Sequence, residues 1–116
     1  EINSNIKPIL VGNLIFSISN EGYLYLIDKN EGNILRITDL FVNYKDKKRK
    51  NINPIGFVIG DKNLFLTNSD GNIIVAGIED GNIIKIEKIS GGVISEPFIF
   101  NNSLYVVRNG SILQFN

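Results

Sequence analysis

Apolar and polar residues follow one another along this chain in short runs, and each run ends at a turn rich in Gly, Asn or Asp. The runs are rich in β-branched and aromatic residues and too short for helices, so they predict strands. We expect eleven strands, at residues 8–12, 14–19, 23–28, 33–40, 54–60, 63–68, 72–78, 82–88, 97–100, 103–108 and 111–115. The pattern therefore predicts an all-β fold.

The turns between these runs predict antiparallel hairpins. A two-residue turn of type I′ needs positive φ at both central residues, which Gly adopts freely and Asn and Asp adopt more readily than other residues. We expect this turn type at Asp70-Gly71, Asp80-Gly81 and Asn109-Gly110. Glu21-Gly22 and Glu31-Gly32 fit a looser turn with a left-handed Gly. The strands should therefore form four-stranded meanders.

The same arrangement of strands and turns recurs three times, and each copy opens at a proline, at Pro8, Pro54 and Pro97. A repeat of about 40 to 45 residues with several short strands is typical of a β-propeller blade. We place the repeats at residues 6–42, 52–90 and 94–116, the last without a fourth strand. The chain is predicted to be a single propeller segment, residues 1–116, of about two and three-quarter four-stranded antiparallel blades. A small β-sandwich is the alternative, and the even spacing of the turns argues against it.

Charged residues cluster in one segment of the chain, residues 43–51. Twelve basic and twelve acidic residues give no net charge, so nothing indicates nucleic-acid binding, and no apolar run approaches the length of a membrane helix. Segment 43–51, which we interpret as a loop inserted between the first two repeats, is the exception, because five basic residues stand there against one Asp. Its candidate contacts with a partner or an anionic surface are Lys45, Lys47, Lys48, Arg49 and Lys50. A solvated loop without such a contact is the alternative.

The chain offers little catalytic chemistry. It contains no His and no Cys, which removes the commonest general base, the commonest transition-metal ligand and any thiolate site. Most carboxylates fall in turns, where Asp is favoured for backbone geometry. We therefore predict no catalytic residue, no metal site and no cofactor, and we expect that this chain is not an enzyme.

Residues 13–35 and 63–84 resemble the pyrroloquinoline-quinone-like (PQQ-like) propeller repeat. In that repeat a strand ends in a small residue and a Gly turn, and two patterned strands follow. This chain departs from the pattern in two ways. Arg36 and Lys85 stand where the family usually has Trp. On the third strand the family has a small residue, which the second copy keeps as Ala76, whereas the first copy has Leu26. The departures favour the non-enzymatic, BamB-like branch of the family.

That resemblance implies a protein-interaction scaffold of the bacterial cell envelope, located in the periplasm or on the periplasmic face of the outer membrane. Its partners would be other proteins, among them outer-membrane assembly components. The alternative is a fragment of a PQQ-like propeller enzyme, or of a ligand-binding propeller, whose active residues lie in other blades.

The last strand raises a separate expectation. Ending on the third strand of a repeat suggests the C-terminal part of a propeller. Standing alone, such a segment would expose sheet edges, so we expect self-association into dimers or larger assemblies.

Overall fold

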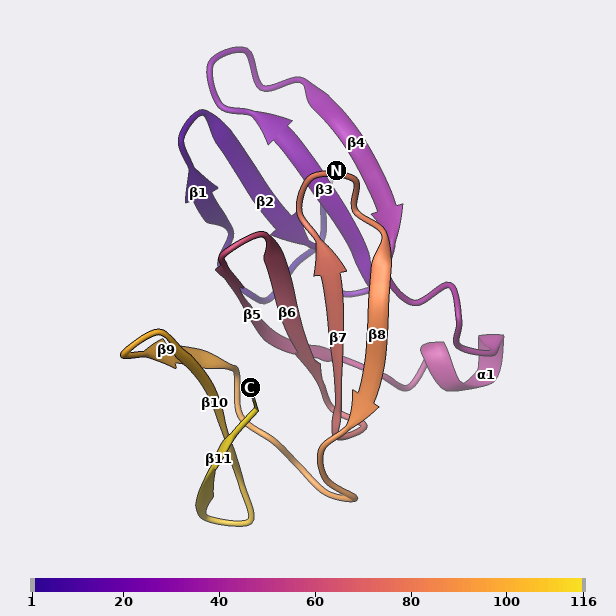
Figure 1. Ribbon diagram of the computed structural model, residues 1–116. Coiled ribbons are helices and arrows are strands. Elements are labelled where there is room, and N and C mark those ends of the chain that lie inside the picture. The colour runs from indigo at the N-terminus through magenta and orange to yellow at the C-terminus, as the bar shows by residue number, and fades with distance from the viewer. Residues whose placement is uncertain (1, 116) are drawn as a thin grey trace. The chain divides into compact units, whose positions relative to one another are not determined.

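The computed structural model describes residues 2–115 and contains three antiparallel sheets in which consecutive strands lie side by side (Figure 1). The first sheet contains β1 (Ile9–Val11), β2 (Leu14–Ile18), β3 (Tyr23–Asp28) and β4 (Ile34–Asp39). The second contains β5 (Pro54–Gly60), β6 (Asn63–Asn68), β7 (Asn72–Gly77) and β8 (Ile83–Lys88). The third contains β9 (Phe98–Phe100), β10 (Ser103–Arg108) and β11 (Ser111–Gln114). The all-β prediction is confirmed, and every predicted strand is present to within two residues at each end.

The chain divides into two compact units, Glu1–Pro54 and Ile55–Asn116. The first unit holds the first sheet, and its buried side chains include Phe16, Ile18, Leu24 and Leu40. β2 pairs with β3 so that Phe16 stands opposite Leu26 and Ile18 opposite Leu24. Side chains that stand opposite each other on paired strands lie on one side of the sheet. Phe16, Ile18, Leu24 and Leu26 therefore form a continuous apolar surface.

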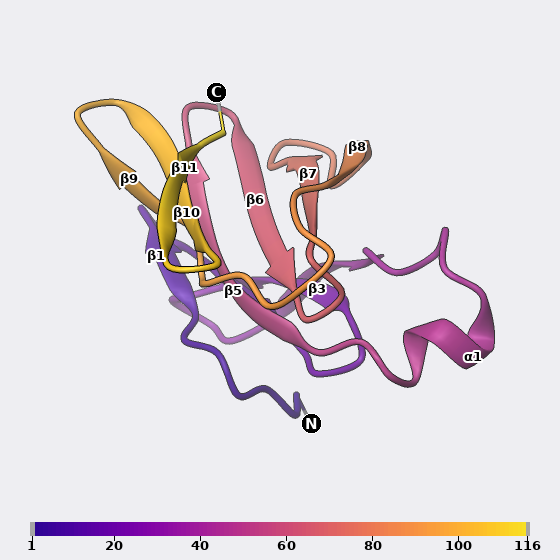
Figure 2. The ribbon, with the colours of Figure 1, turned by 90° about the horizontal axis from the view of Figure 1, so that it is seen from below.

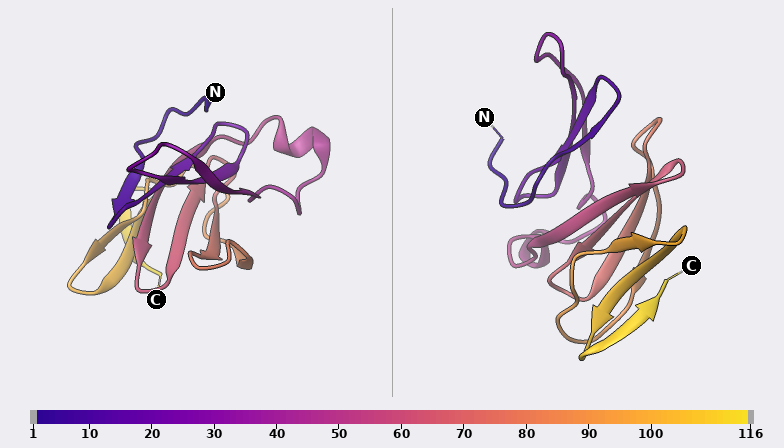
Figure 3. Two further views of the ribbon diagram at one scale, coloured as in Figure 1. Left: turned by 90° about the horizontal axis from the view of Figure 1, so that it is seen from above. Right: turned by 90° about the vertical axis from the view of Figure 1, so that its left-hand side faces the viewer.

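The second unit holds the other two sheets, and the third sheet lies beside the second (Figure 3). A core cluster joins them, made of Phe65, Ile73, Val75, Ile89, Ile94, Leu104 and Val106. The connection between β8 and β9 is fastened to the third sheet, because Ser95 and Val107 exchange hydrogen bonds of 2.8 and 3.0 Å. Residues from two sheets and their connection therefore share one hydrophobic core.

The turn between β2 and β3 has the same form as the turn between β6 and β7. Gly22 donates to the Ser19 carbonyl at 3.0 Å and Gly71 to the Asn68 carbonyl at 3.0 Å, and both glycines have positive φ, of 92° and 83°. In each case the chain leaving the fourth strand returns to the glycine. The Leu40 N–H donates to the Gly22 carbonyl at 2.9 Å, and the Ile89 N–H to the Gly71 carbonyl at 2.8 Å.

The predicted turn type is wrong at two of three positions. Asn109 and Gly110 have φ of 50° and 75°, as a type I′ turn requires. At Asp70-Gly71 and Asp80-Gly81 only the glycine has positive φ. These loops are longer than two residues, so the Asp keeps an ordinary backbone and its carboxylate accepts a hydrogen bond from the N–H two residues on. The left-handed glycines predicted at Gly22 and Gly32 are confirmed.

The basic segment is not a loop throughout. Residues Asp46–Arg49 form one turn of helix, α1, in the connection after β4 (Figure 2). None of its side chains is buried. The sequence predicted a loop because segment 43–51 is polar and basic and lies between two repeats.

Candidate interaction surfaces

Arg49 ties the basic segment to the first sheet. Its guanidinium makes two hydrogen bonds to the carboxylate of Asp39 at the end of β4, Nη2 to Oδ1 at 2.8 Å and Nη1 to Oδ2 at 3.1 Å. Asp39 Oδ1 also accepts the Phe41 N–H at 3.0 Å. One carboxylate therefore fixes both the start of the connection and the end of α1.

The charge of Arg49 is committed to this contact. Donating hydrogen bonds to the Asp39 carboxylate raises the pKa of the Arg49 guanidinium, and this effect outweighs partial burial, which lowers the pKa. The guanidinium carbon also lies 5.9 Å from the centre of the Tyr23 ring, within cation–π range. Among the five predicted contact residues, the side chain of Arg49 is thus held against the first sheet by an ion pair, and its contact with a partner stays a prediction.

The four lysines of the candidate site, Lys45, Lys47, Lys48 and Lys50, are exposed. Lys48 Nζ lies 5.4 Å from the centre of the Tyr44 ring, and that ring packs edge-on against Phe41, 5.5 Å away. Because Phe41 is fully buried, the aromatic pair holds this part of the segment against the unit. The structure therefore brings the lysines together on an anchored turn, and their contact with an anionic partner stays a prediction.

A cavity of about 380 Å³ lies beside this anchor in the first unit, lined by Asn20, Glu21, Arg49, Lys50, Ile52 and Asn53. A second, of about 290 Å³, shares Glu21, Arg49 and Lys50 with it. Each cavity contains a carboxylate as well as cations, so neither has the single-signed lining expected of a dedicated anion site.

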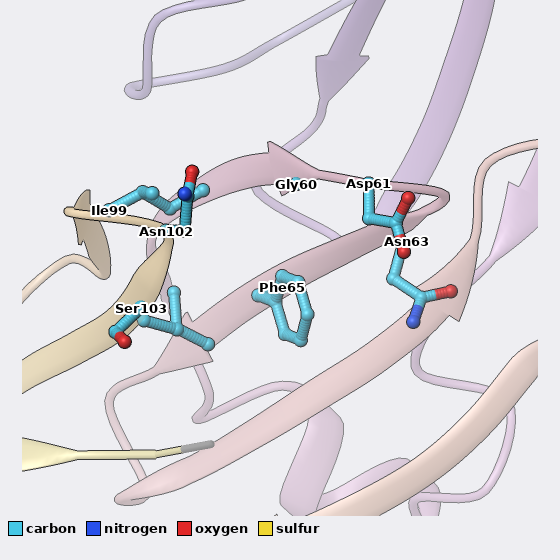
Figure 4. Close-up of a pocket in the computed structure, with 8 residues that line it drawn as sticks. Gly60, Asp61, Asn63, Phe65, Ile99, Asn102 and Ser103 are labelled. Carbon is cyan, nitrogen blue, oxygen red and sulfur yellow. The ribbon is translucent and has the colours of Figure 1, made fainter.

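The second unit has a larger hollow, of about 480 Å³, between the β5–β6 turn and the β9–β10 turn (Figure 4). Its lining mixes apolar and polar side chains: Gly60, Asp61, Asn63, Phe65, Ile99, Asn102, Ser103 and Leu104. Asp61 and Asn102 take positive φ of 57° and 65° in the two turns. Sequence reasoning missed this hollow, because it arises from two hairpins that are distant along the chain.

The fourth strands of the two complete sheets share a bulge that the sequence did not predict. In the first sheet the register between β3 and β4 shifts at Leu26/Ile27, and in the second the register between β7 and β8 shifts at Val75/Ala76. The extra residues are Leu35 and Ile84, which are 56% and 58% exposed. Bulges re-aim side chains at sheet edges, so both outer strands present an aliphatic side chain at an equivalent place.

Several carboxylates that could have served chemistry are engaged in backbone geometry. Oδ1 of Asp28, Asp70 and Asp80 accepts the N–H of the residue two positions later, at 3.1, 3.1 and 2.9 Å. Within residues 2–115, no three His, Cys, Asp or Glu side chains gather in a way that could hold a metal ion. In the same part of the chain, no helix has the length and apolar character needed to cross a membrane.

No family model and no curated protein sequence matches the chain. Solved structures do match. BamB from Moraxella catarrhalis is 18% identical with a TM-score of 0.71, and the match covers 98% of this chain and 32% of that one. The WD40 β-propeller domain of Doa1 is 14% identical with a TM-score of 0.71, covering 93% and 34%. A quinohemoprotein alcohol dehydrogenase from Comamonas testosteroni is 13% identical with a TM-score of 0.68, covering 90% and 17%.

BamB, a WD40 domain and an alcohol dehydrogenase thus match about equally well, and identities this low show the fold alone. The chain has the fold of a β-propeller segment, with two four-stranded blades and a three-stranded one. It spans about a third, or less, of the length of these three similar chains.

Proposed function

We propose that this chain is part of a non-catalytic propeller scaffold that binds other proteins in the bacterial cell envelope. The observation that carries the proposal is the repeated bulge on the outer strands β4 and β8, with the exposed side chains Leu35 and Ile84. Two copies of a repeat that differ at most positions both keep an aliphatic residue there. An exposed edge with apolar anchors suits an extended segment of a partner protein.

The non-catalytic part of the proposal is supported by the use of the carboxylates. Asp28, Asp70 and Asp80 hold turns through their side-chain oxygens, and Asp39 neutralises Arg49. Groups that stabilise the backbone in this way are poorly placed to exchange protons with a substrate. The envelope location follows from the resemblance of residues 13–35 and 63–84 to the PQQ-like repeat and its BamB-like branch.

Photo-crosslinking in the source organism tests the proposal. Benzoylphenylalanine is introduced at Leu35 or at Ile84, and adducts are identified by mass spectrometry after cell fractionation. Val93, which is 76% exposed and lies outside the strands, serves as the control position. We expect adducts with an envelope protein from both strand positions and none from Val93. Adducts with cytoplasmic proteins, adducts of the chain with itself only, or equal labelling at Val93 would overturn the proposal.

A further inference from the structure

The repeat gives each sheet two faces that can be compared between sheets. Side chains alternate across a strand, so one face of each sheet carries the residue equivalent to Phe65 and the other the residue equivalent to Leu64. We name them the aromatic face and the aliphatic face. The aromatic face carries Phe16 in the first sheet, Phe65 in the second and Tyr105 in the third. The aliphatic face carries Ile15, Leu64 and Leu104 at the matching positions.

The aromatic face is buried in the first two sheets and open in the third. On it, Leu24, Ile73 and Ile112 occupy equivalent positions after the hairpin glycine, and their exposed fractions are 1%, 0% and 68%. Tyr105 pairs with Phe98 on the same face, and the two rings stack with centres 5.6 Å apart. The third sheet therefore presents to solvent a surface that its two counterparts keep buried.

The aliphatic face shows the opposite distribution. It is buried in the second sheet, at Leu64 and Ile74, and in the third sheet, at Leu104 and Val106. In the first sheet the same face is open. There Leu10, Ile34 and Ile37 are each more than half exposed, and Ile15, Tyr25 and Ile27 lie between them in the register.

The second unit shows how the two kinds of face fit together. Phe65, Ile73 and Val75 from the aromatic face of the second sheet share a core with Leu104, Val106 and Leu113 from the aliphatic face of the third. The Phe65 ring also meets the Phe115 ring edge-on at 6.3 Å. Packing of an aromatic face on an aliphatic face is thus an interface that this sequence already forms.

We propose that the open aromatic face of the third sheet binds the open aliphatic face of the first sheet in a second copy of this chain. The chain carries a second aromatic face and a second aliphatic face of the kind that already pack together in the second unit. Both are open to solvent, as the exposed side chains of Ile112 and Ile37 show. The two faces are different surfaces, so the contact is head-to-tail rather than symmetric. Ile112 would take the place that Ile73 has in the second unit, and Tyr25 the place that Leu113 has.

This assembly uses faces of the sheets, whereas the proposed partner contact uses the outer edges at Leu35 and Ile84. The two proposals therefore rest on different residues and fail independently.

Sedimentation equilibrium of the purified 116-residue chain, at concentrations up to about 1 mM, gives the first test. The variants are Ile112→Glu, which places a charge on the aromatic face, and Ile37→Glu, which places one on the aliphatic face. Both residues are more than half exposed, so neither change should unfold the chain, and circular dichroism checks this. Val93→Glu is the matched control, since Val93 is more exposed than either and lies on neither face.

We expect the unaltered chain to associate, and each face variant to weaken association by about tenfold or more, because a buried unpaired charge opposes contact. Val93→Glu should change it less than about twofold. A monomeric unaltered chain, or a folded Ile112→Glu variant that associates normally, would overturn the proposal.

Mixing the two face variants tests the head-to-tail arrangement. Ile112→Glu keeps its aliphatic face and Ile37→Glu keeps its aromatic face. An equimolar mixture should therefore form a dimer and nothing larger, at concentrations where each variant alone associates at least about tenfold more weakly than the unaltered chain. A mixture that remains monomeric would exclude the head-to-tail contact.

Discussion

The hairpin glycines of the two complete sheets differ from the one in the third sheet in what surrounds them. A Cβ built on Gly22 would lie 2.3 Å from the Phe41 ring, and one built on Gly71 would lie 2.0 Å from the Ser90 carbonyl oxygen. A Cβ on Gly110 would meet nothing within 4 Å. All three glycines have positive φ, so backbone conformation alone does not distinguish them.

The difference lies in the fourth strand. Where a fourth strand exists, the chain leaving it packs onto the hairpin glycine and donates a hydrogen bond to it, through Leu40 in the first sheet and Ile89 in the second. The third sheet has no fourth strand within the described residues, so its glycine supports a turn only. All three turns therefore favour glycine for its conformation, and two of them also need it for close packing.

Gly71→Ala should cause the largest loss of stability. The new methyl group would overlap backbone atoms, which cannot move aside without breaking the Ile89 hydrogen bond, and φ is +83°. We expect the free energy of unfolding to fall by about 3 to 5 kcal/mol, measured by urea denaturation. Gly91→Ala is the matched control, because a Cβ there meets nothing within 4 Å and no positive φ constrains it. An equal loss in both variants would contradict the packing argument.

Gly22→Ala should cost less, about 2 to 3 kcal/mol, because the obstacle is a side-chain ring rather than backbone. Phe41 is fully buried, so its ring has little room to move. Combining Gly22→Ala with Phe41→Leu should recover part of the loss, and a double-mutant cycle measures the coupling between the two positions. Strict additivity of the two losses would show that the ring is not the obstacle.

Asp39→Ala should have a smaller effect, a loss of about 1 kcal/mol in the free energy of unfolding, because it removes a bidentate and partly buried ion pair with Arg49. Since the pKa of Arg49 is raised by this contact, the stabilisation linked to the guanidinium is fully present at neutral pH and is lost as strongly alkaline pH deprotonates it. Glu87→Ala is the control, because its 3.4 Å pair with Lys85 is half exposed and should contribute nothing measurable. Equal losses in the two variants would mean that the Arg49 contact is not an anchor.

Gly110→Ala should have the smallest effect of the three glycine substitutions, about 1 kcal/mol, from positive φ alone. A thermal melt suffices to measure it, since 1 kcal/mol shifts the midpoint of a small domain by about 4 to 8 °C. A shift as large as that of Gly71→Ala would remove the distinction between packing and conformational glycines.

Strand positions could be predicted because Gly, Asn and Asp mark nearly every strand end in this sequence. Turn type could not be predicted from Asp-Gly pairs, because the pair does not specify how many residues the loop contains. Asp70 and Asp80 were assigned positive φ, whereas both keep negative φ and cap their turns with a carboxylate oxygen. Loop length depends on the register of both strands, and one strand alone does not encode it.

The candidate surfaces were predictable only in part. Charge alone located the basic residues of segment 43–51, but the pairing of Arg49 depends on Asp39, ten residues earlier, which the fold brings within hydrogen-bond distance. The exposed bulges at Leu35 and Ile84 could not be foreseen, since a bulge is a relation between two strands.

Every sheet in this structure pairs strands that are consecutive in sequence, in the orders β1-β2-β3-β4, β5-β6-β7-β8 and β11-β10-β9. Within residues 2–115, every hydrogen-bonded pair of strands joins two strands that follow each other along the chain. Local pairing of this kind favours rapid folding, since only short loops must close. During synthesis each sheet can form as soon as its last strand leaves the ribosome, and whole sheets can be duplicated or deleted in evolution without breaking a ladder.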